Sequence, residues 1–182
     1  MRRVSVPTDR IAVVGAGASA LVLDLAAGGY RTIEAVDISA AALRLLCARL
    51  GSLAASVHCL CTDVRRVAFA TQVDVWHDRA TFHFLTDPAD QRLYAGCAAA
   101  SVAPGGYLVM ATFSDRGPEQ CSGLPVTRHS VASLVEVFAP EFDLVESFEL
   151  DHTTPWGAPQ SFLHAVFHRR ADPAFDYASS GK

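Results

Sequence analysis

The sequence of 182 residues predicts one α/β domain, in which a mostly parallel sheet carries helices on both faces. Short apolar segments alternate with helical segments along most of the chain, which is the βαβα pattern of a parallel sheet. A glycine-rich turn joins the first apolar segment to the first helical one. Two long runs close the sequence, and the short connection between them suits an antiparallel hairpin better than a crossover.

The first four strands are predicted from apolar segments, at 10–14, 32–37, 56–62 and 73–78. A helix at 18–28 follows the first strand and ends at a pair of glycines. The helix after the second strand begins near Ser39 and ends before Gly51, because serine is a favoured N-cap and glycine a favoured C-cap. Asp87 and Pro88 predict the start of a helix that reaches Val102, with the proline in its first turn.

In the last third of the chain we expect a short strand at 107–112, a loop at 114–125 and a helix at 128–138. The closing hairpin is expected to pair strands at 142–150 and 161–169. The domain boundaries predicted from these elements are a short N-terminal segment at 1–9, one domain at 10–170 and a flexible tail at 171–182. The segment at 104–106, Pro-Gly-Gly, ends the preceding helix and leads into the fifth strand.

The glycine-rich turn indicates a nucleoside-type cofactor. Gly15, Ala16 and Gly17 stand between a strand and a helix, so the backbone can approach a ligand and helical N–H groups face it. Asp37 ends the next strand about 20 residues later, where a carboxylate can accept hydrogen bonds from ribose hydroxyls. A tight β–α turn without a ligand is the alternative interpretation.

Composition excludes several classes of protein. Half of the residues are hydrophobic, and the formal net charge of −4 offers no basic field for nonspecific binding of nucleic acid. No apolar run reaches the roughly 18 residues needed to span a bilayer. The first nine residues lack the apolar core of a signal peptide. We therefore expect a cytoplasmic protein that binds neither nucleic acid nor membrane.

Five cysteines, an odd number, stand at Cys47, Cys59, Cys61, Cys97 and Cys121. Most fall in apolar segments, where a free cysteine behaves as a small hydrophobe, so we expect these to be buried. Cys121 falls in a polar loop. Cys59 and Cys61 share one face of a strand, which is not a zinc spacing, and no metal site is predicted. A metal or a disulfide at this pair is the less favoured alternative.

The order of these features resembles the class I S-adenosylmethionine-dependent methyltransferases over about 10–170. The resemblance depends on the glycine turn, the acid after the second strand, Asp63 after the third, the fourth-strand segment and the Pro-Gly-Gly turn. It implies a Rossmann-like, mostly parallel seven-stranded sheet with a C-terminal antiparallel hairpin. More narrowly, 76–80 with 82–85 is similar to the Asp-Arg segment of thiopurine-type and thiol-type small-molecule methyltransferases. The same segment resembles the Asp-Lys-Gly segment of some protein-lysine methyltransferases.

The resemblance implies S-adenosylmethionine as the cofactor and seven residues that bind it: Gly15, Ala16, Gly17, Asp37, Ile38, Asp63 and Val64. The glycine turn would lie against the methionine part and the ribose, and Asp37 would accept from the two ribose hydroxyls. Ile38 would pack against the adenine ring. Asp63 would accept from the adenine amino group, with Val64 beside it.

His77, Asp78 and Arg79 are the candidate catalytic residues, because the carboxyl ends of strands border the crevice of an open α/β sheet. Asp78 could take a proton or orient an amine, and Arg79 could bind a substrate carboxylate in bidentate fashion. In the alternative, Asp78 caps the following turn and pairs with Arg79. His77 and His83 could each be simply packed beside a neighbouring aromatic ring.

Two departures from the family stand out. Val13 occupies the position, two before the first glycine, where the family usually carries an acid. Only residues 1–9 precede the first strand, where such enzymes usually have one or two helices that close over the site. A homodimer could supply this cover, and a non-catalytic methyltransferase-like subunit is an alternative function.

The substrate is expected to be a small molecule, with a protein amine as the nearest variant. No Asn-Pro-Pro-Tyr segment follows the fourth strand, which argues against methylation of adenine amino groups or glutamine amides. A flap formed by 121–125, and Trp156 in the hairpin connection, could reach the mouth of the site. An NAD(P)- or FAD-dependent oxidoreductase is the alternative enzyme class, because the glycine pattern and Asp37 also fit dinucleotide binding.

Overall fold

The computed structural model describes residues 4–17, 19–154, 157 and 159–171, and Trp156 lies outside them. Seven strands form one sheet in the order β3-β2-β1-β4-β5-β9-β8. Their bounds are β1 (Arg10–Val14), β2 (Thr32–Asp37), β3 (Val57–Cys61), β4 (Val73–Arg79), β5 (Val102–Phe113), β8 (Phe142–Thr153) and β9 (Pro159–Arg169). The first five pair in parallel, and β9 runs antiparallel to both β5 and β8. The predicted fold is therefore confirmed, including the closing hairpin.

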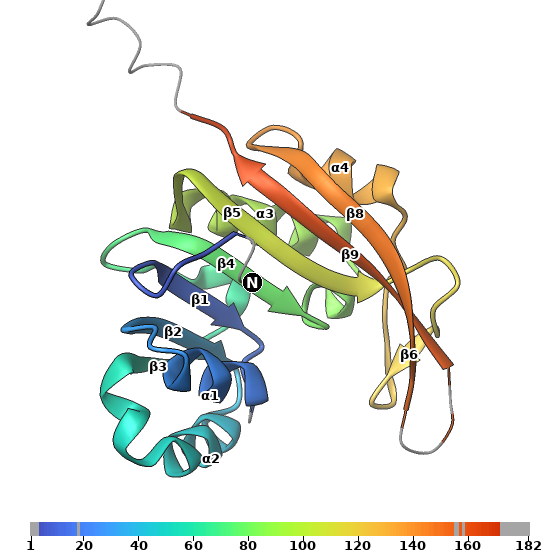
Figure 1. Cartoon of the computed structure of the whole chain (residues 1–182). Helices are drawn as coiled ribbons and strands as arrows, with labels where there is room; N and C mark the ends of the chain where they lie inside the picture. Colours follow the sequence, from blue (N-terminus) through green and yellow to red (C-terminus); the bar gives the residue numbers. More distant parts are fainter. Residues whose placement is uncertain (1–3, 18, 155–156, 158, 172–182) are drawn as a thin grey trace, which may run out of the picture.

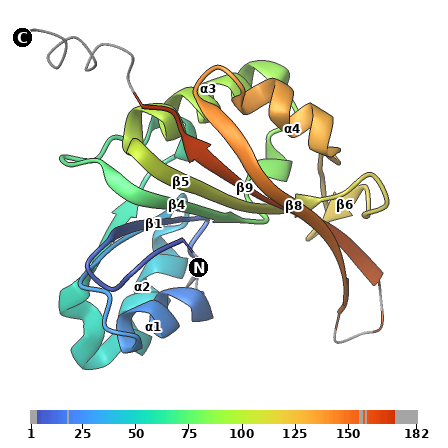
Figure 2. The same ribbon diagram turned by 45° about the horizontal axis from the view of Figure 1, so that its top comes forward.

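Helices cover both faces of this sheet (Figures 1 and 2). The α-helices are α1 (Ala20–Ala27), α2 (Ala40–Leu50), α3 (Pro88–Ser101) and α4 (Val131–Phe138). In Figure 2, α1 and α2 lie below the sheet, and α3 and α4 lie above it. The shorter elements are the 3₁₀ helices η1 (Gly51–Ser56), η2 (Val64–Arg66) and η3 (Phe82–Phe84), and a separate hairpin of β6 (Gln120–Cys121) and β7 (Leu124–Pro125).

Local sequence signals explain where the helices begin. The Ser39 hydroxyl accepts from the N–H of Ala42 at the start of α2, and Gly51 follows its last residue. The Asp87 carboxylate accepts from the N–H of Ala89 at the start of α3, and Pro88 occupies the first turn. Both predicted starts are confirmed, because each cap satisfies an N–H group that has no partner within the helix.

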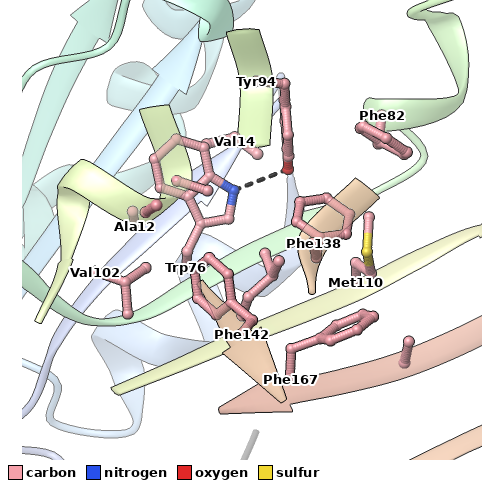
Figure 3. Packing of buried hydrophobic residues seen from close by; sticks show 14 of the residues in the cluster. Ala12, Val14, Trp76, Phe82, Tyr94, Val102, Met110, Phe138, Phe142 and Phe167 are labelled. Carbon is pink, nitrogen blue, oxygen red and sulfur yellow. Dashed lines mark hydrogen bonds between the residues drawn. The ribbon is translucent and has the colours of Figure 1, made fainter. Parts of the chain in front are cut away.

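The core divides into two layers, one on each face of the sheet. The layer beneath α3 and α4 is aromatic and surrounds the fully buried Trp76, as Figure 3 shows. The indole N–H of Trp76 donates to the Tyr94 hydroxyl over 2.9 Å. The layer beneath α1 and α2 is built from smaller aliphatic residues such as Ile11, Val22 and Ile33.

β5 begins five residues earlier than the sequence predicts. The Pro-Gly-Gly segment is part of the strand, at an irregularity where the register with β4 shifts between Val73 and Val75. Gly106 is required there, because an added Cβ would lie 2.6 Å from the carbonyl oxygen of Asp74. Its compact backbone lets the chain stay in the sheet at a point where the sequence indicates a turn.

The prediction that most cysteines are buried is wrong for the first three. Cys47, Cys59 and Cys61 are exposed, since α2 presents Cys47 on its outer side and β3 is the edge strand of the sheet. Within the described residues, none of the helices combines the length and the apolar character needed to cross a membrane.

Candidate active site

Two cavities lie at the carboxyl ends of the parallel strands and share Gly15 and Ala80 in their walls. The larger has a volume of about 620 Å³ and is lined by the ends of β2, β3 and β4 and by β7. The smaller has a volume of about 480 Å³ and is lined by the glycine turn, the start of α1, the end of β4, and residues of β5, β6 and β9. Their shared boundary makes them adjoining parts of one site.

The glycine turn that separates the cavities depends on glycine at its first position. Gly15 has a φ of +59°, and a Cβ built there would lie 1.8 Å from the Oγ1 atom of Thr81. Any larger residue would therefore collide with the segment after β4 and adopt a strained backbone. Ala16 is buried and lines the smaller cavity, whereas Gly17 lines neither of these two cavities in the described part of the chain.

The Asp37 carboxylate lines the larger cavity and also fastens the glycine turn. Its Oδ2 atom accepts from the N–H of Gly17 over 2.7 Å. Its Oδ1 atom accepts from the N–H of Ser39 over 2.7 Å. Because each carboxylate oxygen has two lone pairs, each keeps one acceptor position after these bonds. Two adjacent acceptor positions suit the two hydroxyls of a ribose.

An apolar wall stands beside Asp37 in the larger cavity. Ile38 is 74% exposed although it is a large aliphatic residue, and it lines the cavity. Further apolar lining comes from the end of η3, the residue after it, and β7: Phe84, Leu85, Leu124 and Pro125. Exposed apolar surface of this kind suits a flat ring such as adenine. The predicted flap at 121–125 thus divides, with Cys121 in the smaller cavity and its other end in the larger one.

Asp63 lines the larger cavity with Val64, but its carboxylate already has donors. The Arg65 guanidinium donates to both oxygens, and the Arg65 N–H donates to Oδ1. These hydrogen bonds lower the pKa of Asp63 to about 2. Arg65 also forms an ion pair of 2.7 Å with Asp90 on α3. The adenine amino group would therefore compete with Arg65 for the carboxylate.

His77 and Arg79 line the smaller cavity, on the face of β4 that α1 covers. The Nδ1 atom of His77 is buried and has no hydrogen-bond partner among the described residues. Burial, with a further contribution from nearby Arg79, lowers the pKa of His77 to about 4, so the ring is neutral at pH 7. In the described structure, the exposed Arg79 guanidinium makes neither a hydrogen bond nor an ion pair.

Asp78 lines neither of the two cavities. The prediction that its side chain contacts the substrate is therefore wrong. Strand residues alternate between faces, so Asp78 points away from its two neighbours. It is fully buried and accepts from the N–H groups of Thr81 and Phe82 and from the Tyr94 hydroxyl at 2.6 Å. The alternative role, capping the following turn, is the observed one, although the described residues show no ion pair of Asp78 with Arg79. Burial raises the pKa of Asp78 to about 6.

His83 is also packed rather than exposed to a cavity. Its ring is fully buried and stacks on Phe113 at a centroid distance of 4.6 Å. Neither ring nitrogen has a hydrogen-bond partner among the described residues, and burial lowers the pKa of His83 to about 4. Val13 is buried as well and forms part of the wall of the smaller cavity.

Comparison with known families decides between the two enzyme classes. The family model described as "Methyltransferase domain" matches residues 11–106, more than half of the chain. The chain belongs to this methyltransferase family. No curated protein matches the sequence. The oxidoreductase alternative is therefore set aside.

Solved structures of methyltransferases share the fold at low identity. An S-adenosylmethionine-dependent methyltransferase from Methanosarcina mazei is 14% identical with a TM-score of 0.80, covering 94% of this chain and 97% of that one. The N-methyltransferase NodS from Bradyrhizobium japonicum, solved with S-adenosylhomocysteine, is 17% identical with a TM-score of 0.71, covering 89% and 79%. The 1,6-didemethyltoxoflavin N1-methyltransferase of Burkholderia thailandensis, with its substrate and S-adenosylhomocysteine, is 19% identical with a TM-score of 0.72, covering 90% and 72%.

Together the family and these structures indicate S-adenosylmethionine as the cofactor of this methyltransferase. The larger cavity fits that molecule by its own chemistry, with two free acceptor positions on Asp37 beside the exposed Ile38. The residue assignments themselves stay predictions. Sequence reasoning expected the 121–125 flap at the substrate and gave η3 no place in this wall, because no local pattern indicates that η3 and β7 meet at β2.

Proposed function

We propose that this methyltransferase transfers the methyl group of S-adenosylmethionine to a nucleophilic atom of a small molecule in the smaller cavity. One observation carries the proposal: the two cavities adjoin at Gly15 and Ala80 but offer different chemistry. The larger cavity offers the two free acceptor positions of the Asp37 carboxylate and an apolar wall. The smaller offers a neutral histidine and an arginine that has no counterion among the described residues. When bound, the cofactor supplies a methyl group on a positively charged sulfur.

In this proposal Asp37 holds the ribose hydroxyls and Ile38 packs against the adenine. The main chain at Gly15 and Ala16 lies along the methionine part, and the Gly17 N–H holds the Asp37 carboxylate in place. Asp63 and Val64 border the adenine edge, with Arg65 holding the Asp63 carboxylate in place. Asp78 acts indirectly, because it fixes the N–H groups of the turn that contains Thr81, and Thr81 packs against the glycine turn.

The smaller cavity would bind and orient the methyl acceptor. Arg79 would pair with an acidic group, since a guanidinium binds carboxylates through two parallel hydrogen bonds. His77 is neutral at pH 7, so it can accept a proton or a hydrogen bond from an attacking amine, thiol or hydroxyl. Alignment of the two reactants is the main requirement for such a displacement.

A small acceptor is supported by the size of the smaller cavity, about 480 Å³, which lies in the range for sites of small molecules. The N1-methyltransferase of Burkholderia thailandensis, solved with bound 1,6-didemethyltoxoflavin, has the same fold. Within this class of small acceptors, we propose a thiopurine-type or thiol-type compound. A protein lysine is the nearest alternative acceptor. A homodimer that covers this cavity also remains a proposal.

The test has two stages. Isothermal titration calorimetry with S-adenosylhomocysteine should give saturable binding to the purified protein, and NADH should give none. A panel of acidic amines, thiols and heterocycles, incubated with methyl-labelled cofactor, should then yield at least one labelled small molecule. Saturable binding without any transfer, also to protein extracts, would overturn the proposed reaction. Absence of binding would overturn the cofactor site and favour the non-catalytic subunit, which the apolar Val13 in the cavity wall supports.

A further inference from the structure

Two cysteines make a contact that the proposed reaction does not use. The Sγ atoms of Cys47 on α2 and Cys59 on β3 lie 3.1 Å apart. A disulfide bond is about 2.0 Å long, so only a small movement would join them. Both residues are exposed, which leaves them open to an oxidant.

The remaining three cysteines have different neighbours in the described part of the chain. Their sulfurs face oxygen atoms: Cys61 faces the carbonyl of Ile38 at 3.6 Å, Cys97 the carbonyl of Arg65 at 2.9 Å, and Cys121 the hydroxyl of Ser122 at 4.0 Å. The geometry therefore distinguishes one pair among the five.

We propose that Cys47 and Cys59 form a redox-active dithiol that hydroperoxides oxidise to an intramolecular disulfide, which fastens α2 to β3. One thiolate attacks a peroxide oxygen, the O–O bond breaks, and a sulfenic acid forms while water or an alcohol leaves with the proton. The second sulfur attacks the sulfenic sulfur, the S–S bond forms, and the S–O bond breaks to release water. The two thiols lose two electrons and one hydroperoxide is reduced.

The contact lets either sulfur complete the reaction. Partial burial and the hydrogen bond with Cys47 raise the pKa of the Cys59 thiol. Thiolate is the attacking form of cysteine. Whichever sulfur is oxidised first, the other is already in contact and can resolve the sulfenic acid.

The bond would join two elements that border the larger cavity. α2 starts directly after Ile38 and Ser39, and β3 ends directly before Thr62 and Asp63. Ile38, Thr62 and Asp63 line that cavity. A cross-link between residues 47 and 59 closes a short loop, which restricts the unfolded chain and stabilises the folded one. Oxidation would thus stiffen this edge of the sheet whether or not the protein is an active enzyme.

The experiment exposes the full-length protein to hydrogen peroxide, alkylates remaining thiols with iodoacetamide, and maps tryptic peptides without reduction. Cleavage after Arg44, Arg49 and Arg65 places Cys47 in peptide 45–49 and Cys59 in peptide 50–65. We expect these two peptides to be linked. The melting temperature should rise by about 5–10 °C and return after treatment with dithiothreitol.

Variants identify the sulfurs, because peptide 50–65 also contains Cys61. Cys61→Ser should keep the linked peptides, and Cys47→Ser and Cys59→Ser should lose both the link and the rise in melting temperature. The proposal is overturned if wild-type protein keeps both thiols alkylatable, forms a Cys59–Cys61 bond, or oxidises only to cross-linked dimers or sulfinic acid. Because the wild-type protein alone gives each of these results, a variant that fails to fold does not remove the test.

Discussion

The two cavities share a boundary but differ in how their polar groups are partnered. In the larger cavity, Asp37 accepts from two backbone N–H groups, and Arg65 holds Asp63. In the smaller one, Arg79 makes no hydrogen bond or ion pair with any described residue, and Nδ1 of His77 is buried without a partner among them. Groups that are already paired keep their positions before a ligand arrives. Unpaired groups can obtain their partners from a ligand, so in the proposed function a prearranged cofactor side would contrast with an acceptor side that the substrate completes.

Gly15→Ala tests the boundary between the cavities and should have the largest effect. The added Cβ would lie 1.8 Å from the Thr81 hydroxyl oxygen, so the turn or the Thr81 segment must shift. We expect S-adenosylhomocysteine affinity to fall at least about 100-fold, near 3 kcal/mol, by calorimetry. Gly29→Ala is the matched control, since Gly29 also has a positive φ but its Cβ would meet nothing within 4 Å. Equal losses in both variants would show that backbone strain alone is responsible.

Asp37→Ala tests whether the larger cavity is the cofactor side. Charge-assisted hydrogen bonds contribute about 1.5–3 kcal/mol each, so affinity for S-adenosylmethionine should fall at least about tenfold. Asp87→Ala provides the control, because the Asp87 carboxylate also accepts from a backbone N–H but lies outside both cavities. It should lower stability and leave the affinity unchanged. An unchanged affinity in Asp37→Ala, measured by calorimetry, would remove Asp37 from the cofactor site.

Arg79→Ala tests the acceptor side. Loss of the guanidinium should raise the KM for an acidic acceptor about tenfold or more, while the Kd for the cofactor stays within about twofold. Arg79→Lys should recover part of the effect, because the charge remains without the bidentate geometry. Arg31→Ala, another exposed arginine, serves as the control. A rise in the cofactor Kd that equals the rise in KM would place Arg79 on the cofactor side.

The pH dependence of stability tests whether the histidines are neutral, as the acceptor side requires of His77. Burial lowers the pKa values of His77, His83 and His129 to about 4, below the ordinary value near 6.5. The unfolded chain therefore binds protons that the folded chain does not, so their stabilising contribution is complete above pH 6.5 and is lost as pH falls toward 4. Asp78 opposes this trend, because its pKa is raised to about 6 and its contribution is lost as pH rises through that value.

Because the three histidines outweigh Asp78, the folded protein should lose stability overall when the pH is lowered. Urea unfolding between pH 7 and pH 5 should show a decrease on the order of 3 kcal/mol. His83→Phe should reduce this decrease, since the ring packs on Phe113 without hydrogen bonds in the described structure. His58→Phe, at an exposed position, should not. A stability that is flat with pH would show that these histidines are charged or solvated.

Local sequence predicted which residues meet at the larger cavity, because these residues follow directly from strand ends. Gly15, Asp37 and Asp63 each come at the point where a parallel strand gives way to a turn, and parallel strands end at one edge of the sheet. The same reasoning grouped Asp78 with His77 and Arg79. The strand period of two, applied at this position, is enough by itself to put Asp78 on the opposite face from the other two.

Other features had no local signal. Leu124 and Pro125 line the larger cavity because the loop after β5 folds back to the ends of β2 and β4. The extent of the hairpin was also longer than predicted, and β8 and β9 project beyond the neighbouring strands in both views (Figures 1 and 2). Their outer residues are polar or exposed, so hydrophobic alternation gave little indication of where the strands end.

The sequence by itself determined the order of strands and helices, the caps that start the helices, and the glycine turn with its acid, since each depends on neighbours within a few residues. The tertiary structure alone decided which polar groups find partners in distant elements. Arg65 reaches Asp90, Tyr94 reaches Asp78, and Cys47 reaches Cys59 because separate elements pack together. Hydrogen bonds and burial act over a few ångströms in space, and distance along the chain does not predict them.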